Sequence, residues 1–175
     1  CNRSAKRATS TRNPQMKNFI RSLSVALVAV ALHCAPVHAG PQEDAASALL
    51  DRFHSAAAKA DFDTYFAAFT PDGVFLGTDA TERWNVAQFK AYAKPHFDKG
   101  RGWTYTKVER NINVSADGAH ASFDELLDNK SLGRCRGTGV LRKIDGQWRI
   151  EQYHLTIPVP NELEDEVVKR IRAGK

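Results

Sequence analysis

The residues with the clearest chemical potential lie in the segment His120–Asp128, which reads HASFDELLD. Side chains alternate along a strand, so Phe123, Glu125 and Leu127 share one face while Ser122 and Asp124 share the other. Glu125 is therefore a carboxylate on an otherwise apolar face. If that face is buried, desolvation raises its pKa and makes it a candidate general base or acid. A salt bridge is the alternative interpretation, because an arginine such as Arg136 would keep Glu125 ionised. One bulge would exchange the positions of Glu125 and Asp124.

A second chemical signal lies between Gly133 and Asn161, where two strand-like runs flank Asp145-Gly146, a strong hairpin signal. Strict alternation places Trp148, Ile150, Gln152 and His154 on one face, and Arg149, Glu151, Tyr153 and Leu155 on the other. A two-residue turn pairs Gly137 with His154. A three-residue turn pairs Arg136 with His154 and groups both with Gln152, as an acidic or carbonyl ligand would require. Gly137 and Gly139 either leave space for a ligand or permit twist or a bulge.

These patterns lead to two sets of candidate site residues. The candidate catalytic residues are Glu125, Asp124 and His154. The candidate pocket residues are Tyr65, His96, Trp103, Arg136, Gln152 and Tyr153. The histidines lie too far apart in sequence to form a metal-binding motif, so we expect neither a metal nor a cofactor. The catalytic motifs GxSxG, Gly-rich phosphate loop and Cys/His dyad are not visible.

The charge balance of the chain argues against nucleic-acid binding. The 175 residues hold 25 basic and 20 acidic side chains, for a formal net charge of +5. Six basic residues and no acidic ones lie within residues 1–39, which leaves 19 basic against 20 acidic residues in the rest. A nearly neutral remainder offers no electrostatic basis for binding a polyanion.

Residues 16–39 are typical of a cleavable signal peptide. Met16 opens a basic start, an apolar run from Leu23 to Leu32 follows, and Val37-His38-Ala39 fits signal-peptidase cleavage. The run is about half the length that spans a bilayer, so we expect no stable membrane anchor after cleavage and a periplasmic or secreted protein. Residues 1–15 read as an upstream or expression remnant. Cys135 would then be the remaining cysteine, and we expect it to be a small buried apolar residue.

The mature chain reads as one domain with helices first and strands last. Apolar spacing predicts helices over residues 41–60, just after Asp61, and from Asn85 to about Lys94, where Pro95 should kink or end the helix. His54 flanks the first stripe as a boundary residue. Residues 70–73 read as a turn and 74–76 as a short strand. Four strands are predicted at 103–114, 119–128, 134–144 and 147–157, and a helical tail from Asn161. The predicted fold class is α+β, with a curved, mostly antiparallel sheet covered by helices on one face.

The segments FTPDGVFL, FDELLD, GRCRGTGVL and GQWRIEQYHLT, in this order after an N-terminal helix, resemble the nuclear-transport-factor-2-like (NTF2-like) superfamily and its SnoaL-like branch. The resemblance covers residues 41–161, with the domain assigned to 40–161 and a helical tail to 162–175. It implies a cone-shaped sheet wrapped around a long helix, a pocket at the open end, and a homodimer. It also implies an Asp or Glu base with Tyr, Asp or His partners in those members that are enzymes.

Three hypotheses follow for the function. The first is an exported, dimeric domain that binds a small, partly apolar molecule in the cone. The second is a cofactor-independent lyase or isomerase, in which Glu125 or Asp124 abstracts a proton beside a carbonyl and Arg136, Tyr153 or His154 stabilises the oxyanion. The third is a protein-interaction module, which predicts a filled cone without a pocket.

Overall fold

A computed structural model describes residues 40–174 of the chain. The predicted upstream remnant and signal peptide lie outside these residues. In chain order the elements are α1 (Pro41–Ala58), α2 (Phe62–Ala67), β1 (Phe69–Leu76), β2 (Arg83–Asn85), α3 (Val86–Phe97), β3 (Thr106–Val114), β4 (His120–Asn129), β5 (Gly133–Ile144), β6 (Gln147–Thr156), a 3₁₀ turn η1 (Asn161–Leu163) and α4 (Glu164–Arg172). No described helix is both long and apolar enough to cross a membrane.

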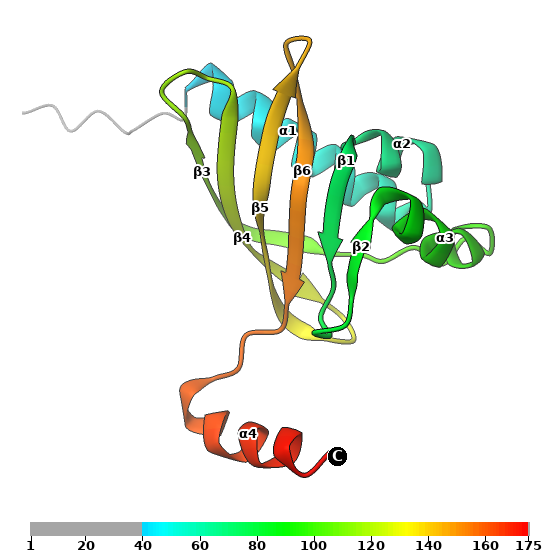
Figure 1. Cartoon of the computed structure of the whole chain (residues 1–175), viewed down its shortest axis with the longest axis vertical. Helices are drawn as coiled ribbons and strands as arrows, with labels where there is room; N and C mark the ends of the chain where they lie inside the picture. The colour runs from blue at the N-terminus through cyan, green and yellow to red at the C-terminus, as the bar shows by residue number, and fades with distance from the viewer. Residues whose placement is uncertain (1–39, 175) are drawn as a thin grey trace, which may run out of the picture. The chain divides into compact units, whose positions relative to one another are not determined.

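Helix α1 forms because its apolar residues recur every three or four positions and make one stripe. Pro41 occupies the first turn, where its missing N–H costs nothing, and acidic residues follow it at the positive end of the helix. The stripe is fully buried and comprises Ala46, Leu49, Leu50, Phe53 and Ala57. This apolar stripe holds α1 against the inner face of the sheet, next to β3 and β6 (Figure 1).

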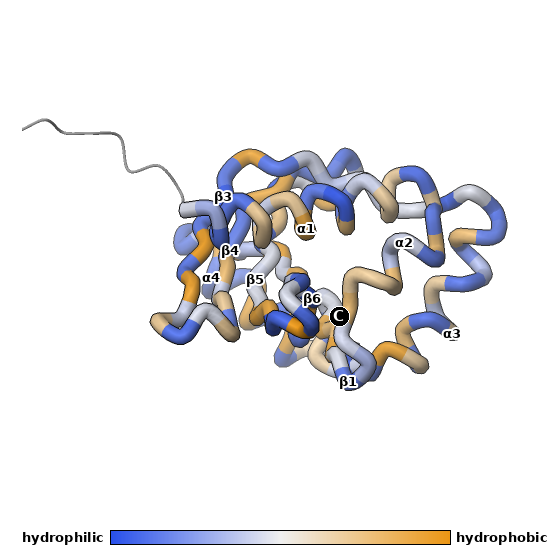
Figure 2. The backbone as a smooth tube through the Cα atoms, turned by 90° about the horizontal axis from the view of Figure 1, so that it is seen from above, coloured by the Kyte–Doolittle hydropathy of each residue, from blue (hydrophilic) through white to orange (hydrophobic). Residues whose placement is uncertain are grey.

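The two shorter helices begin with the caps that the sequence predicts. Asp61 accepts a hydrogen bond from the Thr64 amide at 3.1 Å, and Asn85 and Gln88 form a reciprocal capping box. The predicted end of α3 at Lys94 was wrong, because the helix continues through Pro95 to Phe97. Burial of Phe97 in the core outweighs the single amide donor that proline removes in the last turn. Figure 2 shows hydrophilic and hydrophobic positions interleaved along α3.

Six strands form one open sheet in the order β2-β1-β6-β5-β4-β3. All neighbours are antiparallel except β1 and β6, which run parallel because α3 and the long meander separate them in the chain. The sheet curves around α1 (Figure 1). The predicted α+β class and the predicted meander are both confirmed. The predicted turn at residues 70–73 instead lies inside β1, whose pairing with β6 shifts register between Phe69 and Val74.

The hairpin between β5 and β6 has a two-residue turn, which is one of the two alternatives that the sequence left open. Asp145 and Gly146 both have positive φ, at 50° and 76°, and Ile144 pairs with Gln147 across them. The pairing nevertheless shifts between Leu141↔Ile150 and Val140↔Gln152, so that Glu151 is an extra residue in β6. Neither predicted partner of His154 is therefore correct. Thr138 lies opposite His154 instead, and Arg136 lies opposite Thr156.

The same bulge changes which side chains face inward. Trp148 and Ile150 are buried before it, and Tyr153 and Leu155 are buried after it. The prediction that Trp148, Ile150, Gln152 and His154 share a face was therefore wrong. One extra residue reverses the alternation, so β6 presents apolar side chains to the core both before and after the bulge.

Two further predictions concern Cys135 and the C-terminal tail. Cys135 is completely buried within β5, as expected of a small apolar residue, and burial raises the pKa of its thiol. The tail is helical from Asn161, with a 3₁₀ first turn. None of the residues of α4 is buried, although the helix is strongly amphipathic.

Candidate functional site

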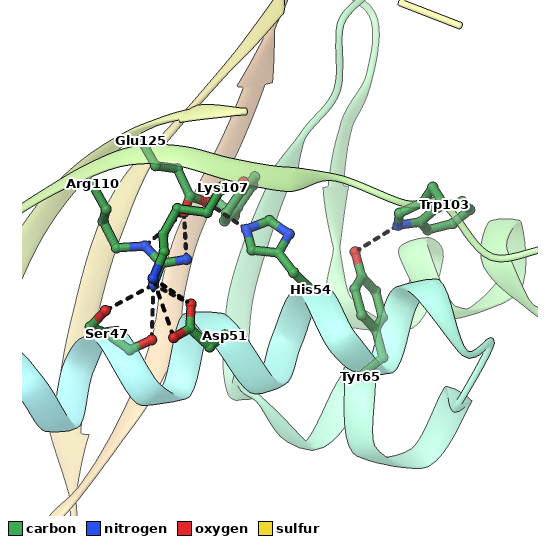
Figure 3. A network of polar contacts seen from close by, with 9 residues as sticks. Ser47, Asp51, His54, Tyr65, Trp103, Lys107, Arg110 and Glu125 are labelled. Atoms are coloured by element: carbon green, nitrogen blue, oxygen red, sulfur yellow. Dashed lines mark hydrogen bonds and ion pairs between the residues drawn. The ribbon is translucent and has the colours of Figure 1, made fainter. Parts of the chain in front are cut away.

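Glu125 is the centre of a polar network in the core. It lies on the inner face of β4 between Phe123 and Leu127 and is completely inaccessible to solvent. Its Oε1 atom is 2.7 Å from the Nε2 atom of His54 on α1 and accepts a hydrogen bond from the Tyr153 hydroxyl on β6 at 2.8 Å. A carboxylate at this depth is tolerated only with partners that replace its water. Figure 3 shows His54 on α1 and Glu125 on the sheet directed toward each other.

The positive charge that balances Glu125 comes from Arg110 on β3. Arg110 and Glu125 are direct cross-strand neighbours, because the β3–β4 register shifts between Lys107 and Glu109. The Nε atom of Arg110 donates to Oε2 at 2.8 Å, and its Nη2 atom lies 2.8 Å from the same oxygen. The Arg110 side chain is only 3% exposed, so this ion pair is shielded from water and from salt.

Arg110 also ties the sheet to α1. Its Nη1 atom donates to the carbonyl oxygen of Ser47 at 3.0 Å, to the Ser47 hydroxyl at 2.9 Å and to Asp51 at 2.7 Å (Figure 3). Lys107 donates to Asp51 as well, at 3.1 Å. The two acids and two bases of this network balance each other. Ser47, Asp51 and His54 occupy one face of α1, being spaced by four and three residues.

The network keeps Glu125 ionised. Burial alone would raise the pKa of Glu125, but the hydrogen bond from His54, the charge of Arg110 and the hydrogen bond from Tyr153 outweigh burial and lower the pKa. Burial and the neighbouring carboxylate raise the pKa of Tyr153 well above its ordinary value, so its hydroxyl stays protonated. An ionised carboxylate only accepts hydrogen bonds, and therefore Nε2 of His54 carries a proton toward it.

The lowered pKa of Glu125 predicts a specific loss of stability in acid. A group whose pKa is depressed by folding stabilises the protein above its ordinary pKa, here 4.5, and that stabilisation is lost as the pH falls through the folded value. We expect the free energy of unfolding to fall more steeply below pH 4.5 in the wild-type chain than in Glu125→Gln. Denaturant unfolding at a series of pH values measures both slopes. Equal slopes would contradict this assignment.

A cavity of about 170 Å³ lies beside the network. Most of its wall is aromatic, with contributions from Phe53, Tyr65, Phe75, Trp84, Phe89 and Trp103. His54 and Tyr153 also line it, whereas Glu125 lies behind these two side chains and does not reach the wall. A molecule in the cavity would therefore contact His54 and Tyr153 directly. Glu125 would act on it only through these two side chains.

Three of the sequence-predicted pocket residues line this cavity. They are Tyr65, Trp103 and Tyr153. The indole N–H of Trp103 donates to the Tyr65 hydroxyl at 3.4 Å, which joins the coil before β3 to α2 (Figure 3). Burial raises the pKa of Tyr65, so this hydroxyl also remains neutral.

The other predicted pocket residues lie elsewhere. Arg136 and Gln152 are exposed and do not line the cavity, because the bulge at Glu151 and the alternation of β5 place them on the outer face of the sheet. His96 is exposed on α3 and packs against the ring of Tyr92, with the ring centroids 5.6 Å apart. Among the described hydrogen bonds and ion pairs, none joins Arg136, Gln152 and His154 into the predicted cluster.

The structure separates the three predicted catalytic residues. Glu125 faces α1, whereas Asp124 and His154 lie on the outer face of the sheet. Asp124 accepts a hydrogen bond from the Asn111 side chain at 3.2 Å, as a surface residue would. The salt-bridge alternative named an arginine such as Arg136 as the partner of Glu125, and the arginine in contact with Glu125 is Arg110. The catalytic roles themselves remain predictions.

Sequence reasoning did not identify His54, Arg110, Asp51 or Ser47 as partners of Glu125. A usable signal existed on α1, since polar residues at positions 47, 51 and 54 follow helical spacing beside the apolar stripe. Within residues 40–174, no three His, Cys, Asp or Glu side chains are arranged to hold a metal ion.

Residues 46–160 match the family model described as a SnoaL-like domain. No curated protein matches the chain.

Solved structures share the fold at low sequence identity. An NTF2-like protein of unknown function from Pseudomonas putida KT2440 superposes with a TM-score of 0.57 at 16% identity, over 67% of this chain and 87% of that one. An uncharacterised protein with a cystatin-like fold from Caulobacter vibrioides gives 0.57 at 20% identity, over 75% and 99%. A provisionally assigned scytalone dehydratase from Novosphingobium aromaticivorans DSM 12444 gives 0.56 at 13% identity, over 66% and 83%.

The family match spans most of the domain, from the first half of α1 to the end of the coil after β6. The chain belongs to the SnoaL-like family and has the NTF2-like fold.

Proposed function

We propose that this SnoaL-like domain binds a small, partly apolar molecule in the cavity between α1, α3 and the sheet. The observation that carries the proposal is the aromatic wall of the cavity, on which a few polar side chains converge, His54 and Tyr153 among them. A mostly apolar pocket with a few converging polar groups is the usual form of a small-molecule site. Export to the periplasm or the medium, proposed from residues 16–39, and a homodimer belong to the same proposal.

The size of the cavity limits the ligand. An apolar cavity of about 150 Å³ accepts benzene, so a volume of about 170 Å³ suits a molecule with roughly one ring inside the wall. Anything larger would extend through the mouth, which Thr78, Tyr92 and Leu132 line with exposed side chains. The cavity also weighs against a pure interaction module, because that hypothesis requires a filled cone.

Calorimetric titration with p-cresol tests this proposal. We expect saturable binding with a dissociation constant below about 1 mM, because the ring buries apolar surface and the hydroxyl finds an acceptor. Thr78→Phe should narrow the mouth and weaken binding about tenfold or more. Ala80→Phe is the matched control, because Ala80 is exposed on the same loop and does not line the cavity. Absence of p-cresol binding, or equal binding by both variants, would count against the site.

The pairing of His54 with Glu125 supports a second candidate function. A neutral His54 that donates from Nε2 keeps a lone pair on Nδ1, which is the arrangement of a general base oriented by a carboxylate. His54 would then abstract a proton beside a carbonyl, and Glu125 would stabilise the resulting imidazolium as a positioning residue. The likeness to a provisionally assigned dehydratase is compatible with such lyase chemistry.

The two candidate functions can be separated by product analysis. A metabolite extract would be incubated with the wild-type chain and with His54→Gln, and both the free and the bound small molecules would be analysed by mass spectrometry. A compound consumed only by the wild-type chain supports catalysis. A compound recovered unchanged from both proteins supports binding alone.

A further inference from the structure

The charged groups around the cavity differ in whether they are neutralised. Glu125 is paired with Arg110, and Asp51 with Arg110 and Lys107. Glu82 is the carboxylate that lines the cavity itself, and none of the described lysine, arginine or histidine side chains lies within ion-pair distance of it. No lysine or arginine is among the described residues that line the cavity. The cavity therefore carries one uncompensated negative charge.

We propose that the ligand of this cavity is a small organic ammonium ion. This inference rests on the proposed function, which it narrows to one chemical class. An ammonium ion would place its positive charge near Glu82 and its carbon substituents against the aromatic wall. Three features support this inference: the unpaired carboxylate of Glu82, the acceptor oxygen of Tyr153 on the inner side of the cavity, and the aromatic wall.

Glu82 is held at the cavity by its own turn. It is half-buried, and its Oε2 atom accepts a hydrogen bond from the Asp79 amide at 3.2 Å. The same oxygen lies 2.1 Å from the position where a Cβ atom on Gly77 would be, and Gly77 also lines the cavity. A larger residue at position 77, just after β1, would displace the Glu82 carboxylate from this position. A half-buried carboxylate without a cation is a favourable place for a positively charged ligand.

The polar groups on the inner side of the cavity also favour a ligand that donates hydrogen bonds. Tyr153 directs its hydroxyl proton at Glu125, so the Tyr153 oxygen is left as an acceptor. The Glu82 carboxylate and the Tyr153 oxygen are therefore both available as acceptors in the cavity. An anionic ligand would meet these two acceptors and no lysine or arginine among the described lining residues.

The aromatic wall adds attraction for a cation. The faces of aromatic rings carry negative potential, and tryptophan attracts cations most strongly. Trp84, Tyr92, Trp103 and Tyr105 line the cavity and retain partial exposure. Trp84 and Tyr92 stack with their centroids 4.7 Å apart, which presents a rigid aromatic surface near Glu82 on the adjoining turn. Several rings around one carboxylate form the environment in which quaternary ammonium groups bind.

Choline and 3,3-dimethylbutan-1-ol provide a direct test, because they have the same shape and hydroxyl group and differ only in the positive charge. Each would be titrated calorimetrically into the full chain at low salt. We expect choline to bind about tenfold more tightly than its neutral isostere. Glu82→Gln should reduce choline affinity several-fold and leave the isostere unchanged. Tyr92→Leu, at an exposed position, should also weaken choline more than the isostere.

Asp63→Asn is the matched control for the loss of one negative charge, since Asp63 is exposed on α2 and does not line the cavity. It should leave both affinities unchanged. If the isostere binds as tightly as choline while p-cresol still binds, the ammonium inference is wrong and the proposed function stands. If choline, its isostere and p-cresol all fail to bind, both proposals are wrong. An equal loss of choline affinity in Asp63→Asn and Glu82→Gln would likewise overturn the inference.

Discussion

Glu125→Gln is expected to lower the free energy of unfolding by about 3–5 kcal/mol. The substitution keeps the shape of the side chain but leaves the Arg110 guanidinium without its counter-charge at a position where only 3% of that side chain is exposed. Asp51 does not replace Glu125, because it pairs with the other end of the guanidinium and is shared with Lys107. Denaturant unfolding monitored by circular dichroism gives the free energy directly.

Asp124→Asn supplies the matched control on the same strand. It removes one negative charge at the neighbouring position, where the side chain lies on the outer face and contacts Asn111. We expect a change within about 0.5 kcal/mol, as for most surface substitutions. Similar losses in Glu125→Gln and Asp124→Asn would show that net charge matters and that the buried ion pair does not.

The double variant Arg110→Met with Glu125→Leu gives an independent check. Removing both charges together leaves no unpaired guanidinium in the core. The double variant should therefore lose much less stability than Glu125→Gln alone. A double variant that is less stable than Glu125→Gln would mean that the network stabilises the fold through the packing of its side chains. The unpaired charge would then not explain the loss of stability in Glu125→Gln.

Gly137→Ala is expected to destabilise the protein by about 1–3 kcal/mol, although it adds only a methyl group. A Cβ atom at position 137 would lie 2.3 Å from the Tyr153 hydroxyl and 2.9 Å from Oε1 of Glu125. Tyr153 is 2% exposed and has little room to withdraw. The new methyl group would therefore break or distort the hydrogen bond between Tyr153 and Glu125. Thermal and denaturant unfolding measure the effect.

Combining Gly137→Ala with Tyr153→Phe identifies the clash. Removing the hydroxyl eliminates the closest contact, so the cost of Gly137→Ala should be smaller in the Tyr153→Phe background. Additive costs would place the strain elsewhere in β5. The space above Gly137, which sequence reasoning assigned either to a ligand or to strand twist, is occupied by the Tyr153 hydroxyl.

The sequence by itself determined the local elements of the fold. Helical spacing in residues 41–58, the Asn85–Gln88 capping box and the Asp145-Gly146 turn each depend on residues within a few positions of one another. Such signals can be read without knowing the tertiary structure, because backbone preference and local hydrogen bonds produce them. Alternation also placed Glu125 correctly on the inner face of β4, where burial is complete.

Only the tertiary structure decided which side chains Glu125 meets. Its partners His54, Tyr153 and Arg110 lie 71, 28 and 15 residues away in sequence, and each reaches it from a different element. The extra residue Glu151 in β6 turned Tyr153 inward and His154 outward. A bulge of this kind is set by packing against α1 and by pairing with two neighbouring strands. Local sequence therefore specifies that a strand forms, while contacts between distant elements fix the register that builds the site.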